Sequence, residues 1–199
     1  GGANFYGPKT GRGSETAYYY VESLTGGKYE LHHSDTTPGT GYSVTDEDRY
    51  PITGFTFKTY TAEQGGNWFD GYYEKYDGAR FYYTRNSYKI VFINGGAEDK
   101  TLSKKYQQDI SDANYTPTAP AGKVGYEFAG WYDNELCEGT AYNFTSKTMP
   151  ANNITLYAKW VEPVHKVEFL VDNKVVTEWT KTDVAHNSPI SDLPTPESS

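Results

Sequence analysis

Apolar and aromatic residues alternate with polar ones in short runs along this chain of 199 residues. A period close to two is typical of strands with one buried face. The clearest runs lie at 52–60, 78–85, 88–93, 125–132 and 154–160. Residues with high helix propensity are sparse, whereas Gly, Thr, Asn and Pro are common between the runs, as in turns. The pattern therefore predicts a chain built mainly of strands and turns.

The segment 88–160 shows this pattern most completely. Its first strand, 89–93, is followed by Asn94-Gly95-Gly96, which predicts a hairpin because these residues accept positive φ. The returning strand is expected at 101–110. Pro-rich residues 112–124 predict an extended crossover with one helical turn nearby, since proline is excluded from a central strand. The core is expected to include Ile90, Phe92, Tyr126, Phe128, Trp131, Leu156 and Trp160.

The pattern repeats along the chain. Strand-like openings begin at Tyr18, Tyr88 and His165, about 70 to 77 residues apart, so each repeat is long enough for its own small core. This spacing predicts a tail at 1–16, modules at 17–87 and 88–160, and a partial third repeat at 161–199. We expect a fragment of a longer protein, cut inside a repeat. Junctions of two or three residues predict a semi-rigid, elongated array.

Composition and charge narrow the class of protein. Aromatic residues make up 17% of the chain, with twenty Tyr and one Met. Mean hydropathy is −0.76, and no apolar run approaches the roughly 20 residues that a membrane span needs, so we expect no membrane insertion. The net charge of −8 argues against nucleic acid as a partner, because phosphate binding requires a basic face. We expect a monomer.

The signature of segment 88–160 resembles the Listeria–Bacteroides repeat, a module of the internalin B-repeat type found in Gram-positive surface proteins. The matching residues are Tyr88-x-Ile90-x-Phe92, Asn94-Gly95-Gly96, Pro117-x-x-Pro120, Gly125-Tyr126-x-Phe128-x-Gly130-Trp131-Tyr132, and Met149-Pro150-Ala151-Asn152 running into Ile154-Thr155-Leu156-Tyr157-Ala158-Lys159-Trp160. The resemblance implies an α+β, mostly β fold of tandem β-grasp, ubiquitin-like modules. It also implies a place on the bacterial cell surface, so we expect an extracellular protein that is held at the cell surface or secreted.

Residues 17–87 resemble the mucin-binding-type modules that often precede such repeats. The resemblance rests on the Tyr-Tyr-Val opening at 19–21, Gly54-Phe55-x-Phe57, and the ending Phe81-Tyr82-Tyr83-Thr84-Arg85-Asn86. The internal spacing departs from that of the second module, chiefly at 61–79. Residues 163–196 resemble the first half of another repeat.

Few residues suggest chemistry. Cys137 is the only cysteine and has no Cys-His pattern around it, so we interpret it as a small residue in a loop. His32 and His33 stand near carboxylates, but neighbours on a strand point to opposite faces, so we do not expect them to share a metal. Asp46-Glu47-Asp48 lacks the spacing of a calcium loop and predicts a solvated turn. No nucleotide, zinc-protease or hydrolase motif occurs, so we expect no enzyme activity and no cofactor.

The segment 64–78 departs from the repeat and concentrates aromatic residues among Gly, Asp and Asn. Such a mixture stacks on sugar rings or anchors a protein partner. The alternative is that these aromatics pack the first module's core or form a hairpin there. The candidate ligand-binding residues are Trp68, Phe69, Tyr72, Tyr73 and Tyr76.

Two functions fit these observations. The first is a non-catalytic stalk or adhesin segment of a bacterial surface protein, with a host or matrix glycan or protein as the partner. The second is a carbohydrate-binding accessory segment of a secreted multidomain enzyme. Further repeats with a cell-wall anchor in the parent protein would favour the stalk, whereas a catalytic domain would favour the accessory segment.

Overall fold

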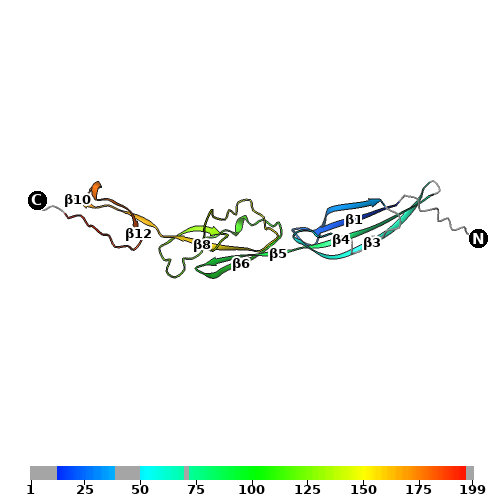
Figure 1. Cartoon of the computed structure of the whole chain (residues 1–199), viewed down its shortest axis with the longest axis horizontal. Helices are drawn as coiled ribbons and strands as arrows, with labels where there is room; N and C mark the ends of the chain where they lie inside the picture. Colours follow the sequence, from blue (N-terminus) through cyan, green and yellow to red (C-terminus); the bar gives the residue numbers. More distant parts are fainter. Residues whose placement is uncertain (1–12, 39–49, 70–71, 196–199) are drawn as a thin grey trace, which may run out of the picture. The chain divides into compact units, whose positions relative to one another are not determined.

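The computed structural model describes residues 13–38, 50–69 and 72–195, and Asp46-Glu47-Asp48 lies outside them. The described chain is mostly strand, as predicted (Figure 1). It divides into two compact units. Unit 1 holds the described residues up to Lys89 together with 103–110 and 146–153. Unit 2 holds 90–102, 111–145 and the described residues from Ile154 onward.

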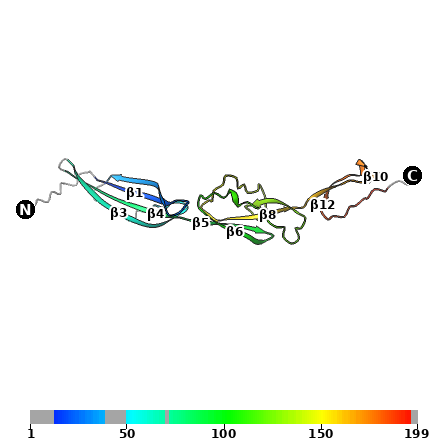
Figure 2. The ribbon, with the colours of Figure 1, turned by 180° about the vertical axis from the view of Figure 1, so that it is seen from behind.

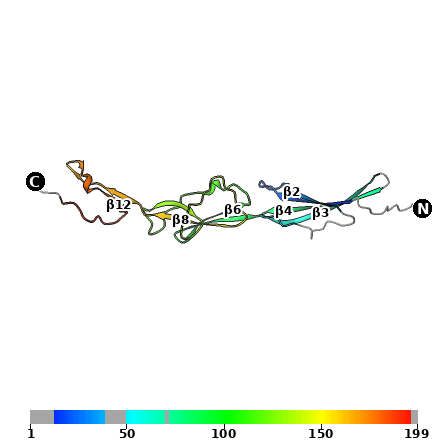
Figure 3. The same ribbon diagram turned by 45° about the horizontal axis from the view of Figure 1, so that its top comes forward.

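The first sheet belongs to unit 1 and has four strands. They are β1 (Gly13–Glu22), β2 (Tyr29–Pro38), β3 (Phe55–Phe69) and β4 (Tyr72–Arg85). Their order is β2-β1-β4-β3, with β1 and β4 parallel in the centre and an antiparallel partner on each side (Figure 3). Strands β3 and β4 form a long antiparallel hairpin whose paired Cα positions run from Phe55 and Arg85 to Phe69 and Tyr72.

A row of rings crosses all four strands of this sheet on its buried face. Tyr60, Phe81, Tyr19 and His33 occupy successive paired positions on β3, β4, β1 and β2. Their ring centroids are 5.8, 5.2 and 4.4 Å apart along the row, and each neighbouring pair is stacked. Phe81 is fully buried and Tyr19 nearly so. The repeated aromatics of the first module thus supply its core, because cross-strand ring pairs stabilise a sheet.

The second sheet repeats the strand order of the first. Its strands are β5 (Ser87–Asn94), β6 (Ala97–Lys105), β7 (Glu127–Tyr132) and β8 (Ile154–Val161). The order is β6-β5-β8-β7, and the central strands β5 and β8 are parallel (Figure 1). A single 3-10 turn, Ser111–Ala113, lies at the start of the crossover and confirms the expected helical turn.

The predicted hairpin after β5 is confirmed, but its second strand lies earlier than predicted. Gly95 and Gly96 have φ values of 62° and 81°, and β6 follows at once from Ala97. It ends at Lys105 rather than Ile110. The strand stops because Gln107 adopts a left-handed φ of 65°, which breaks the extended conformation. The prediction of 101–110 assumed a longer loop between the two strands. The turn consists of Gly95 and Gly96 alone, so the second strand begins four residues earlier than predicted.

Four of the seven predicted core residues of the second module are buried: Ile90, Phe92, Trp131 and Leu156. Tyr126, Phe128 and Trp160 are half-buried instead. The ring of Phe92 meets those of Tyr115 and Trp131 at centroid distances of 5.0 and 4.7 Å, and the Trp131 indole Nε1 donates to the Tyr115 carbonyl at 2.8 Å. The core is therefore centred on Phe92 and Trp131.

A β-bulge in β7 places Phe128 and Trp131 in contact. These residues are three positions apart, so a regular strand would point them to opposite faces. The register shifts between Phe128 and Gly130, and the two rings then lie 5.4 Å apart. Gly130 has a φ of 113°, which a residue with a side chain rarely adopts. The glycine of the repeat signature therefore permits the bulge.

Residues after Val161 form two small ladders in unit 2 (Figure 2). β9 (Val164–Val167) pairs with β12 (Lys181–Ala185), and β10 (Leu170–Val171) pairs with β11 (Lys174–Val175). A 3-10 turn, Thr177–Trp179, lies between them.

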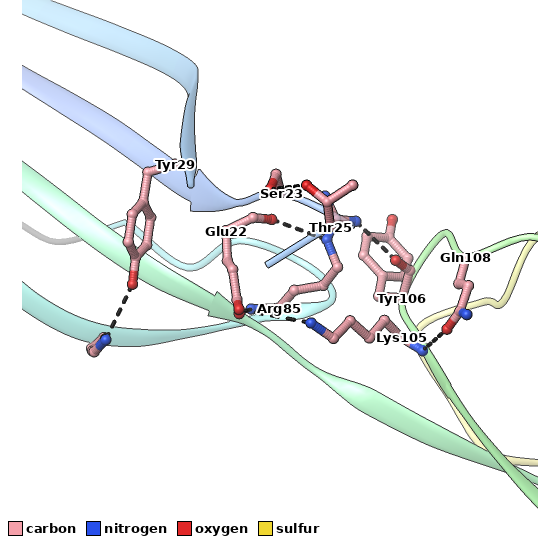
Figure 4. A network of polar contacts seen from close by, with 9 residues as sticks. Glu22, Ser23, Thr25, Tyr29, Arg85, Lys105, Tyr106 and Gln108 are labelled. Carbon is pink, nitrogen blue, oxygen red and sulfur yellow. Dashed lines mark hydrogen bonds and ion pairs between the residues drawn. The ribbon is translucent and has the colours of Figure 1, made fainter. Parts of the chain in front are cut away.

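A polar network in unit 1 ties the end of the first sheet to residues 105–108 (Figure 4). Arg85 Nη1 donates to the Tyr106 carbonyl at 2.8 Å and to Gln107 Oε1 at 2.9 Å. Its Nε donates to the Glu22 carbonyl at 3.0 Å, and its guanidinium lies over the Phe55 ring. Arg85 is only 7% exposed, so its charge is buried, and hydrogen bonds from Nε and Nη1 compensate for the lost contact with water, as such a group requires.

Candidate functional site

The five aromatic residues proposed from the sequence all lie in one hairpin. Trp68 and Phe69 end β3, and Tyr72, Tyr73 and Tyr76 begin β4. In the backbone register Trp68 is opposite Tyr73 and Phe69 is opposite Tyr72. The structure thus brings these positions together along the hairpin. Their side chains lie outside the described part of the chain, so their role in binding stays a prediction.

A second group of aromatic side chains was not singled out from the sequence. We call Tyr20, Tyr29 and Tyr82 the tyrosine face, since strand alternation places them opposite the buried row of Tyr19 and Phe81. Tyr20 and Tyr82 stack at 5.5 Å with an interplanar angle of 20°, and Tyr29 meets Tyr82 edge-on at 5.1 Å. All three are half-buried, so each ring keeps some surface in contact with solvent.

One cation borders the tyrosine face. Lys58 Nζ donates to the Tyr29 hydroxyl at 3.2 Å and lies 5.9 Å from the centre of that ring. Stacked tyrosines beside a polar group can pack on a sugar ring and hydrogen-bond its hydroxyls. The signal in the sequence was the run Tyr18-Tyr19-Tyr20, whose successive members face opposite sides of the sheet.

His32 and His33 do not point to opposite faces of the sheet, as was predicted, so that prediction is wrong. A β-bulge places His32 as an extra residue, because Tyr19 pairs with His33 while Tyr20 pairs with Leu31. The two Nδ1 atoms lie 2.7 Å apart, and the rings meet edge-on. Over the residues that the structure describes, no cluster of three or more His, Cys, Asp or Glu side chains suited to a metal is found.

Cys137 does not have the environment of a nucleophile. Its thiol donates to the Tyr157 carbonyl at 3.7 Å and is partly buried. Burial raises the pKa of the Cys137 thiol, and the charge of Lys159 only partly opposes this shift. A raised pKa lowers the fraction of reactive thiolate at neutral pH. This geometry agrees with the interpretation of Cys137 as a structural loop residue.

Comparison with known proteins agrees with the sequence pattern of the second module. Residues 88–159 match the family model of the Listeria–Bacteroides repeat domain. A stretch of 62 residues, 31% of this chain, is 44% identical to internalin H of Listeria monocytogenes and covers 11% of that protein. A membrane protein of Evansella cellulosilytica is 32% identical over 113 residues, which are 56% of this chain and 16% of the relative.

A Gly-rich membrane protein of the same Evansella species is 34% identical over 85 residues, 42% of this chain and 9% of that protein. The chain thus spans less than a fifth of each of these relatives. In the described part of this chain, no helix has both the length and the apolar character needed to cross a membrane.

Proposed function

We propose that this chain is a non-catalytic repeat region of a bacterial cell-surface protein and acts as a stalk or adhesin segment. The observation that carries the proposal is the match of 88–159 to the Listeria–Bacteroides repeat, together with the similarity to a Listeria internalin. The similarity to two proteins named as membrane proteins also supports a location at the cell envelope. The protein is extracellular in this proposal.

The proposal includes tandem β-grasp modules at 17–87 and 88–160, the first of mucin-binding type. Support comes from the shared order of the two sheets, in which the first and last strands of each sheet are parallel and central. In the second sheet, the crossover between β6 and β7 holds the 3-10 turn Ser111–Ala113 and no long helix. Residues 161–199 would then be the start of a further repeat.

The ligand of an adhesin segment would bind the first module. The hairpin of Trp68, Phe69, Tyr72, Tyr73 and Tyr76 carries aromatics that the repeat pattern does not require. Exposed aromatic rings bind sugars and protein anchors without a cofactor or a strong charge, which suits an acidic chain. The expected partner is a host or matrix glycan or an extracellular-matrix protein.

A binding screen tests this proposal. The wild-type chain is applied to arrays of glycans and extracellular-matrix proteins beside Trp68→Ala, Tyr72→Ala and the tyrosine-face variant Tyr29→Ala. We expect binding that both hairpin variants weaken at least about tenfold, as for an interface hot spot. Circular dichroism of each variant checks its folding. If the folded hairpin variants still bind and Tyr29→Ala does not, the ligand site lies on the tyrosine face. If the wild-type chain binds nothing, the chain acts as a spacer and not as an adhesin.

A carbohydrate-binding accessory segment of a secreted enzyme is the alternative function. The same aromatic residues would serve it, but the preferred ligands would be polysaccharides that an enzyme degrades. The parent gene separates the two functions, because an accessory segment requires a catalytic domain in the same chain, and a stalk requires further repeats.

A further inference from the structure

The bulge in β2 creates a pair of convergent imidazoles. Without the extra residue, His32 and His33 would lie on opposite faces of the sheet. With it, their Nδ1 atoms lie 2.7 Å apart, which means that one nitrogen carries the shared hydrogen and the other accepts it. Bulges of this kind commonly re-aim a side chain next to functional sites.

The ring of His33 is held in place by its neighbours. It stacks on the buried Tyr19 at a centroid distance of 4.4 Å with planes only 6° apart. Tyr50 packs edge-on against it at 4.9 Å. A ligand whose ring is fixed in this way loses little conformational freedom when it binds an ion. His32, in contrast, is exposed and free to adjust its position.

A carboxylate lies behind the same ring. Asp35 Oδ2 is 3.5 Å from Nε2 of His33, on the side of the ring away from His32. Metal-binding histidines usually direct their second ring nitrogen to a carboxylate, a carbonyl or water, which fixes the tautomer and strengthens the ligand. His33 therefore has a partner for Nε2 and presents Nδ1 toward His32.

We propose that His32 and His33 bind one first-row transition-metal ion, such as Zn²⁺, Ni²⁺ or Cu²⁺, through their two Nδ1 atoms. Imidazole nitrogen suits these ions, whereas Ca²⁺ and Mg²⁺ require oxygen ligands. A tetrahedral ion with metal–nitrogen distances of about 2.0–2.1 Å separates two ligand nitrogens by roughly 3.3 Å. The exposed ring of His32 needs to move by only about half an ångström to reach this separation.

The two histidines carry the same number of protons before and after the ion binds. In the free pair, one Nδ1 carries a hydrogen that is shared with the other Nδ1. When the ion binds, this hydrogen transfers to Nε2 of the same ring, and both rings then present a lone pair at Nδ1. On His33 the Nε2–H group faces Asp35.

Water supplies the remaining coordination positions, because the described residues offer no third protein ligand. The site is therefore an open, two-histidine site rather than a closed structural one. Such a site can take a further ligand from a partner molecule, which gives a metal-dependent contact at the surface of the first sheet. This inference does not depend on the ligand proposed for the hairpin.

Titration of the tag-free chain with ZnCl₂, NiCl₂ or CuCl₂ tests the site. Calorimetry should show one ion bound per chain, and the exposed substitution His32→Ala should weaken binding by at least about tenfold. Asp35→Asn should weaken it by about tenfold, the lower end of the range for a carboxylate behind a ligand. Circular dichroism is recorded for each variant, and His32→Ala is preferred because it leaves the Tyr19 stack intact.

The other two histidines provide the matched control. His165 Nε2 and His186 Nδ1 lie 3.1 Å apart, so a double variant His165→Ala/His186→Ala removes a second close pair of imidazoles. This variant should keep the ion, and the copper complex should show hyperfine coupling to two nitrogens that falls to one in His32→Ala. Binding that is unchanged in His32→Ala, or is lost in the His165→Ala/His186→Ala control, overturns the proposal.

Discussion

Arg85 and Glu22 bind each other through side chain and backbone in both directions. Arg85 Nε donates to the Glu22 carbonyl at 3.0 Å, and the backbone N–H of Arg85 donates to Glu22 Oε2 at 3.1 Å. Lys105 Nζ approaches the other oxygen of the same carboxylate at 3.8 Å. The last residues of the parallel strands β1 and β4 are thereby locked together, and residues 105–107 are held to them (Figure 4).

Substitution of Arg85 by alanine should destabilise unit 1 strongly. It removes a buried charge whose hydrogen bonds satisfy the carbonyls of Glu22 and Tyr106, and these groups then lack that donor. Breaking a buried charged network from one side costs about 3–5 kcal/mol. Urea denaturation measures the loss, with the exposed Lys28→Ala as a control expected within about 0.5 kcal/mol of the wild type. A loss below about 1 kcal/mol for Arg85→Ala would contradict the structural role.

Two phenylalanines of the second module should differ in their contribution to stability. Phe92 is completely buried and contacts the rings of Tyr115, Trp131 and Phe144, so Phe92→Ala should cost about 3–5 kcal/mol. Phe128 is half-buried, and its alanine variant should cost clearly less. Denaturation curves of the two variants give the ranking, and equal losses would show that Phe128 is part of the central core.

The first turn of the second sheet, and its strands other than β6, could be predicted from the sequence. Alternation along 89–93 and the pair Gly95-Gly96 act locally, so one stretch of sequence is enough to identify them. The burial of Phe92 and Trp131 follows from the same pattern. The sequence also allowed a hairpin at 64–78, and the structure pairs the end of β3 with the start of β4 there.

The bulges and the contacts between distant segments could not be predicted. The bulges at His32 and Gly130 depend on the register of a strand with its partner, which a single strand does not encode. Because the bulge in β2 could not be foreseen, the imidazoles of His32 and His33 were expected on opposite faces of the sheet. Arg85 gave no signal either, because its acceptors lie 63 residues before it and 21 and 22 residues after it, and only the fold brings them close.

Gly130→Ala should destabilise the second module by about 1–3 kcal/mol. Its φ of 113° is unfavourable for alanine, and the added Cβ would lie 3.0 Å from Cβ of Ala141. Gly139→Ala is the matched control, since Gly139 also has a positive φ of 82° but no atom within 4 Å of an added Cβ. Thermal unfolding should show a larger loss for Gly130→Ala. Equal losses would mean that backbone strain alone accounts for the effect.

Stability should fall at alkaline pH partly through Tyr115. Partial burial raises the pKa of Tyr115 above its usual value near 10, and the hydrogen bond to Asp99 at 2.6 Å and the charge of Asp99 raise it further. The folded chain then holds this proton more tightly than the unfolded chain. The stabilisation is complete below pH 10 and is lost as the pH rises through the raised pKa. Tyr115→Phe cannot ionise, so the free energy of unfolding should decrease less between pH 10 and 12 than in the wild type. Parallel curves would exclude Tyr115 as the source.

The connections between sheets are short enough to predict an elongated array. Asn86 alone separates β4 from β5, and only Glu162 and Pro163 lie between β8 and β9. Connectors of one or two residues leave little rotational freedom, and proline reduces it further. Small-angle scattering should give a radius of gyration well above the roughly 16–17 Å of a globule of this length. Insertion of a flexible Gly-Ser segment after Asn86 is the control, and it should broaden the distance distribution. A wild-type value equal to that of the globule would rule out the extended arrangement, and with it the stalk.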